Sequence, residues 1–227
     1  MIFPALIPII LTKHAPIDKA EQLNFRIIKE IIAFDKRFFL GLVIAVVISS
    51  GSGSGFLTWL ITFLEVQRET SVGVAHLILA SMGIAAFFGR LIWSRVGPKI
   101  TVYRTLLLIV PISVALVFIA PLSKIVMMNI ILFFIAMIFV SGVTPLLLST
   151  ATVYPKSHSS SAYTILFIFM SLGGMLIPFG IGHVFQQEGP VIGMSSISLL
   201  FIIVIGMILL IRKEIQIKKH QRKNPQP

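Results

Sequence analysis

The sequence GRLIWSRVGPK, residues 89–99, separates two long uncharged segments of the chain, residues 71–89 and 105–123. Each of these segments is long enough to cross a bilayer as a helix. The stretch between them contains three basic residues, which are Arg90, Arg95 and Lys99. Basic loops between membrane spans stay on the cytoplasmic side. We therefore interpret residues 89–99 as a cytoplasmic loop that sets the orientation of the chain.

The composition is that of an integral membrane protein. Of 227 residues, 56% are hydrophobic and only 12% are charged, which is too little charge for the surface of a soluble domain. The net charge of +11 is carried mainly by residues at the ends of apolar runs, where basic side chains orient the chain and attract anionic headgroups. We therefore expect a lipid bilayer, and not nucleic acid, as the partner of these charges.

Six apolar segments meet the length of roughly 20 residues that a transmembrane helix needs. They are residues 38–64, 71–89, 105–123, 125–152, 159–182 and 190–211. The predicted fold is an all-α membrane protein with a six-helix bundle over residues 38–211. All of the 19 Lys and Arg residues except Arg68 and Lys124 then fall on one side. This bias predicts a multi-pass protein of the cell membrane with both termini cytoplasmic.

Three segments lie outside this bundle. Residues 1–12 are apolar but too short to span, so we interpret them as the end of a truncated preceding helix, with an interfacial anchor as the alternative. Residues 13–37 form a predicted cytoplasmic linker, and residues 212–227 a basic cytoplasmic tail. Apolar residues recur at helical spacing in the linker, at Leu23, Ile27, Ile31 and Phe34. They predict an amphipathic helix on the membrane surface, or else a solvated helical linker.

Residues 89–99 resemble the loop motif of the major facilitator superfamily. That motif reads glycine, four residues, Asp-Arg, one residue and Gly-Arg-Lys, and it joins the second and third helices of each half. The matching residues here are Gly89, Arg95, Gly97 and Lys99. Ser94 stands at the position of the acid, and Pro98 at that of a basic residue. Second halves usually carry such a degraded copy, so the resemblance implies a C-terminal half.

The resemblance covers nearly the whole chain. Tyr154-Pro155, followed by a serine-rich span with Gly173-Gly174 and Pro178, is similar to the tenth and eleventh helices of many facilitators. The glycine and serine run of the first span, with Trp59 after it, looks most like the fucose-permease-like branch. The implied partner is a missing N-terminal half or a second copy, because facilitators bind substrate between two six-helix halves.

The resemblance also gives the basic stretch a role in conformational change. In the family this loop helps to stabilise the outward-facing state. The residues that would carry this role are Gly89, Arg90, Arg95, Gly97 and Lys99. Ser94 lacks the charge of the family's acid, so the charge-relay part of the role has no residue here.

The first span contains SSGSGSG, residues 49–55, close to its middle. Interrupted helices at mid-membrane indicate transporter binding sites, so Ser52 and Ser54 are candidate substrate-binding residues. Gly51 and Gly55 have GxxxG spacing, which equally predicts tight packing against a neighbouring helix. Both interpretations remain open at this point.

Three further residues are candidate substrate-binding residues. Thr58 and Trp59 follow the glycine run, and an aromatic ring beside hydroxyl groups is a common way to hold a sugar. Tryptophan is also enriched at membrane interfaces without any ligand. His76 lies in the second span, where an ionisable residue is a candidate for a proton relay, although a histidine near the interface costs little.

The sequence lacks the residues that several kinds of catalysis and proton coupling require. None of the six predicted spans contains Asp or Glu, so a carboxylate for proton coupling would have to come from another half. The chain has no cysteine and no HExxH pair, so we expect no metal and no cofactor. The GxSG motif of intramembrane serine proteases is also missing, and we do not expect an enzyme.

The predicted function is therefore secondary transport of a small-molecule substrate by alternating access. The substrate would be a sugar-like solute, or a drug or metabolite. The alternative is a six-helix membrane protein that acts as a homodimer or a regulatory subunit without transport of its own.

Overall fold

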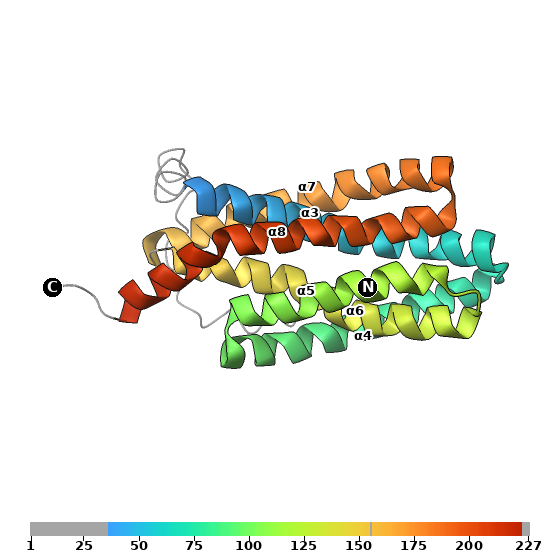
Figure 1. Ribbon diagram of the computed structural model, residues 1–227, viewed down its shortest axis with the longest axis horizontal. Helices are drawn as coiled ribbons and strands as arrows, with labels where there is room; N and C mark the ends of the chain where they lie inside the picture. Colours follow the sequence, from blue (N-terminus) through green and yellow to red (C-terminus); the bar gives the residue numbers. More distant parts are fainter. Residues whose placement is uncertain (1–35, 155, 224–227) are drawn as a thin grey trace, which may run out of the picture.

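A computed structural model describes residues 36–154 and 156–223, and of residues 98, 156–158 and 213–223 it describes the backbone alone. The predicted helix end at residues 1–12 lies outside the described residues. So does the predicted linker, apart from its last two residues. Figure 1 shows an elongated bundle of helices that run up and down its long axis.

The helices, labelled as in Figure 1, are α3 (Lys36–Thr62), α4 (Val72–Ile100), α5 (Val102–Ile119), α6 (Val126–Ser149), α7 (Lys156–Glu188) and α8 (Pro190–Lys223). A π-helix, Phe63–Gln67, continues α3, and short 3-10 helices, Ala120–Leu122 and Thr150–Val153, follow α5 and α6. All six α-helices are long and apolar enough to cross a membrane. The predicted all-α bundle of six membrane helices is confirmed, and the described residues contain no strand.

The connections between the helices fall at two opposite ends of the bundle (Figure 1). We call the end that holds Lys36, Thr101 and Arg212 the basic end. The other end, which we call the opposite end, holds Arg68 and Gly189. The backbone of α8 continues as a helix beyond the sixth predicted span, through most of the basic tail.

The structure corrects the prediction of a loop at residues 89–99. These residues are helical, because α4 continues to Ile100. The chain turns only at Thr101, which has a φ of 135° and whose N–H bonds to the Gly97 carbonyl at 3.0 Å. The second membrane helix is therefore longer at the basic end than the sequence indicated, and the turn is much shorter.

The glycines of this stretch explain the difference, because they serve helix packing and not a turn. A Cβ atom on Gly89 would lie 2.9 Å from the Ile138 Cα of α6, and one on Gly97 would lie 2.5 Å from the Leu146 Cδ2. The contact of Gly89 is with backbone and leaves no room for a side chain, whereas at Gly97 the flexible end of Leu146 would have to shift. Glycine thus lets α4 and α6 approach closely, as small residues do between membrane helices.

The centre of the bundle is α3, which packs mainly against α7 and α8 and also contacts α6. Phe56 of α3 and Phe63 of the π-helix that continues it both meet Phe133 of α6 edge to face, with ring centroids 5.3 Å and 5.7 Å apart. Aromatic pairs prefer this geometry. The core thereby fixes the part of α3 that follows the glycine and serine run.

A polar cluster joins three helices at the opposite end. The Arg68 Nε donates a hydrogen bond to the Asn129 Oδ1 at 2.6 Å, and its Nη2 donates to the Pro121 carbonyl at 2.9 Å. The Asn129 Nδ2 in turn donates to the Ser123 carbonyl at 3.0 Å. Desolvation lowers the pKa of Arg68 from its ordinary value, but arginine stays protonated in proteins. This cluster satisfies carbonyl groups of the short 3-10 helix that follows α5 and of Ser123 just after it.

Candidate functional site: a cavity between four helices

A cavity of about 430 Å³ lies between α3, α4, α6 and α7. This volume falls within the roughly 300–1,000 Å³ of small-molecule sites. Its hydroxyl-bearing lining residues are Ser49, Ser50, Ser54, Ser141, Thr144 and Tyr163. Its remaining lining residues are Gly53, Leu57, Arg90, Met137, Val140, Pro145, Leu148 and Met170. The cavity therefore combines a hydroxyl surface, an apolar surface and one guanidinium group.

The glycine and serine run supplies both the packing face and the cavity face of α3. A Cβ atom on Gly51 would lie 2.5 Å from the Gly173 carbonyl oxygen of α7, and one on Gly55 would also collide with α7, at Ile181. The GxxxG interpretation is thus confirmed as close packing of α3 on α7. Ser50 and Ser54 lie one residue before these glycines and line the cavity instead.

The two candidate serines have different environments. Ser54 lines the cavity. Ser52 is completely buried elsewhere in the bundle, and its Oγ has no hydrogen-bond partner among the described residues. A hydrogen bond of 2.9 Å between Ser49 Oγ and Thr144 Oγ1 joins α3 to α6 at the cavity wall. The hydroxyl surface therefore comes from Ser54 and its neighbours, and Ser52 does not contribute to it.

Thr58 and Trp59 lie outside the cavity lining. The exposed Thr58 donates its hydroxyl to the Ser54 carbonyl of its own helix at 2.9 Å. The Trp59 Nε1 donates to the Pro178 carbonyl of α7 at 2.8 Å, and its ring stacks on Phe185 with centroids 5.0 Å apart. In this arrangement Trp59 ties α3 to α7. A substrate contact at either residue stays a prediction.

His76 is also outside the cavity lining. It is exposed near the start of α4, and its Nδ1 lies 2.8 Å from the Val72 carbonyl oxygen of the same helix. This position is close to the opposite end of the bundle, far along α4 from Arg90. The structure therefore does not bring His76 together with Ser54.

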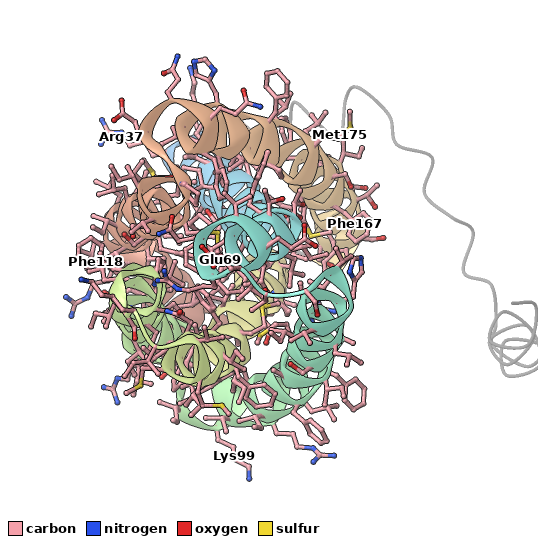
Figure 2. The ribbon with its side chains drawn as sticks, turned by 90° about the vertical axis from the view of Figure 1, so that its right-hand side faces the viewer. Arg37, Glu69, Lys99, Phe118, Phe167 and Met175 are labelled. Carbon is pink, nitrogen blue, oxygen red and sulfur yellow. The ribbon has the colours of Figure 1, made fainter. Side chains whose placement is uncertain are left out.

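The five candidate residues of the basic stretch, residues 89–99, lie in different environments. Gly89 and Gly97 face α6, as described above. All three basic residues are exposed, and of them only Arg90 lines the cavity. Figure 2, which views the bundle from the opposite end, shows Lys99 pointing outward at its periphery. Their part in stabilising one conformation stays a prediction.

Arg90, Ser141 and Thr144 are cavity residues that the sequence interpretation missed. Arg90 was assigned to a loop, although a helix that starts at Val72 and rises about 1.5 Å per residue reaches it within about 27 Å, inside the thickness of the hydrocarbon core. The position of Arg90 within the membrane helix could therefore have been predicted from the sequence. Ser141 and Thr144 carry no such signal, since single hydroxyls are common in membrane helices.

Large apolar side chains are exposed on more than one side of the bundle. Figure 2 shows Phe167 and Met175 pointing outward from α7, and Phe118 pointing outward on another side of the bundle. On α7, Met175 and Phe179 are 76% and 84% exposed. Apolar side chains this exposed need lipid or another protein surface to cover them.

Comparisons with solved structures give transporters of twice this length. The chain has a TM-score of 0.74 and 16% identity to the Major Facilitator Superfamily transporter FucP in its outward conformation, covering 91% of this chain and 51% of that one. It has a TM-score of 0.66 and 14% identity to a bacterial homologue of the human lysosomal transporter Spinster in its inward-facing and unoccupied conformation. That match covers 88% of this chain and 52% of the other. The chain thus spans about half the length of these transporters. No curated protein sequence matches it significantly.

The sequence profile of the Major Facilitator Superfamily matches residues 1–178, which is well over half of the chain. The six membrane helices and the half-length fold match agree with this assignment. The family is one of membrane transporters and not of enzymes. On this evidence the chain belongs to the major facilitator superfamily.

Proposed function

We propose that this chain is the C-terminal half of a secondary active transporter that moves a small solute by alternating access. The observation that carries the proposal is the cavity, which has hydroxyl groups from three helices and a guanidinium group from a fourth, near the middle of an otherwise apolar bundle. Facilitators bind their substrates at mid-membrane between two halves. A second six-helix bundle on the face of α4 and α7 would complete the site and cover exposed side chains such as Met175 and Phe179.

The lining suits a small amphipathic solute, either sugar-like or a metabolite. Hydroxyls such as Ser54 and Thr144 offer both donors and acceptors. Met137 and Met170 offer an adaptable apolar surface.

The orientation belongs to the same proposal. Apart from Arg68 and Lys124, the 19 Lys and Arg residues lie in segments that the predicted threading assigns to one side. Basic residues favour the cytoplasmic side, so the basic end faces the cytoplasm of a cell membrane. Both termini then lie in the cytoplasm.

Uptake by proteoliposomes tests the proposal. The monomeric chain alone should give no uptake, because one half forms only one wall of the site, and addition of a separately purified N-terminal half should give uptake. Uptake that appears only with a covalently linked dimer would make a second copy the partner. Uptake by the monomer alone would contradict the half-transporter assignment, and no uptake by any combination would contradict transport.

A further inference from the structure

Arg90 places a permanent positive charge in the cavity. It is the one charged residue among the described residues that line it. At about 1.5 Å per residue, Arg90 lies about 15 Å along α4 from its end at Ile100. The guanidinium group cannot be deprotonated in proteins, so its charge has to be met by an anion or by water.

The chain supplies no carboxylate near this charge. No Asp or Glu occurs between residues 70 and 187, a range that includes every cavity residue of α4, α6 and α7. The described carboxylates, Glu65, Glu69 and Glu188, lie at the opposite end of the bundle. Arg90 is exposed, so water can reach its charge, and the described residues that line the cavity include no carboxylate. A charge within a membrane helix is costly unless it is paired or hydrated, so Arg90 is placed to bind an anion that comes from outside this chain.

The neighbouring hydroxyls indicate what else that anion carries. Ser50 and Ser54 line the same cavity, and their hydroxyls bond to no other described residue. Hydroxyl groups of this kind can accept hydrogen bonds from a polar solute and donate hydrogen bonds to it. A guanidinium group bonds two oxygens of a carboxylate or phosphate at once.

We propose that the solute is a small hydroxylated organic anion whose carboxylate or phosphate binds Arg90 while its hydroxyl groups meet Ser50 and Ser54. This inference names the substrate class and rests on the proposed function. A cationic solute is disfavoured at this site, because no acidic side chain lines the cavity to offset its charge and Arg90 repels it.

Matched pairs of solutes test the charge requirement. Binding of D-glucuronate and D-glucose, and of glycerol 3-phosphate and glycerol, is measured by calorimetry to the full chain in lipid nanodiscs. At least one anion should bind, and its neutral counterpart should bind at least about tenfold more weakly, as expected for loss of a charge-assisted hydrogen bond. Equal binding within both pairs, or binding by neither anion, would overturn the inference.

Substitutions then test whether Arg90 is the anion anchor. Arg90→Gln should weaken anion binding at least about tenfold, and Arg90→Lys should recover part of it because the charge is kept without the planar fork. Arg104→Gln removes an exposed charge of α5, which does not line the cavity, and should leave binding unchanged. Thermal unfolding of each variant confirms folding. Unchanged anion binding by a folded Arg90→Gln variant would refute the anchor.

The two proposals fail in distinguishable ways. Anion binding that depends on Arg90, without uptake by any reconstituted combination, would contradict transport and leave the anion site standing. Uptake of glucose but not of glucuronate would contradict the anion site and leave transport standing.

Discussion

The Trp93 Nε1 of α4 donates a hydrogen bond to the Ile138 carbonyl oxygen of α6 at 2.8 Å, and its ring lies against Gly142. Trp59 repeats this arrangement on α3, where its Nε1 bonds to the Pro178 carbonyl of α7 and its ring lies against Gly182. Both tryptophans of the chain therefore join a cavity helix to its neighbour. They hold the four cavity helices together in two pairs.

Gly142→Val should destabilise the bundle. A Cβ atom at Gly142 would lie 2.6 Å from the Trp93 Cγ, so α4 and α6 would have to separate, at a cost of about 1–3 kcal/mol for an overpacked site. Gly83→Val is the matched control, since no atom lies within 4 Å of the Cβ position at Gly83 of the same bundle. Thermal unfolding in detergent measures both variants, and equal loss in the two would show that the Trp93 contact is unimportant.

Trp59→Phe separates a packing role from a substrate role. The substitution keeps an aromatic ring beside Phe185 but removes the donor to the Pro178 carbonyl. We expect a loss of about 0.5–1.5 kcal/mol of stability and unchanged solute affinity, measured by thermal unfolding and calorimetry. Lower affinity with unchanged stability would instead support the sequence-based interpretation of Trp59 as a substrate residue.

Arg68→Gln should loosen the opposite end of the bundle. It removes the donor to the Asn129 Oδ1 and to the Pro121 carbonyl, and a buried acceptor left without a partner costs about 1–3 kcal/mol. Lys124→Gln removes the other basic charge of this end, which is exposed, and serves as the control. If both variants lower the unfolding temperature equally, the loss comes from the removal of a positive charge and not from the hydrogen bonds of the cluster.

The number of membrane helices could be predicted from the sequence. A helix satisfies its own backbone hydrogen bonds within a bilayer, so length and lack of charge are enough to identify segments such as residues 38–64 and 125–152 as membrane helices. The packing of α3 on α7 was likewise open to prediction from Gly51 and Gly55. These features depend on local composition and spacing alone.

The position of the turn after α4 and the cavity lining were not predictable in this way. Glycine marks both a turn and a close helix contact, and only the approach of Ile138 shows that Gly89 belongs to the second class. Ser52 and Ser54 are identical in sequence context, yet a rotation of about 200° around the helix axis separates them. Which of them faces the cavity depends on how α3 is turned against α7.

The orientation of the chain is open to a direct test, because the natural chain has no cysteine. Ile100→Cys places a thiol at the end of α4, and Ile125→Cys places one before α6, and both positions are exposed. In intact cells an impermeant maleimide should label Ile125→Cys, whereas Ile100→Cys should react only after permeabilisation. The reverse pattern would invert the orientation, and labelling of both in intact cells would contradict the threading.

If the cavity between α3, α4, α6 and α7 receives a polar solute, water must reach it. The most direct measurement is the reaction of Ser54→Cys in native membranes with a small charged thiol reagent, compared with Leu108→Cys on α5. Leu108 is 50% exposed but does not line the cavity. We predict rapid modification of Ser54→Cys and little of Leu108→Cys, because a charged reagent does not enter lipid. An inert Ser54→Cys, or equal reaction at both positions, would contradict the account.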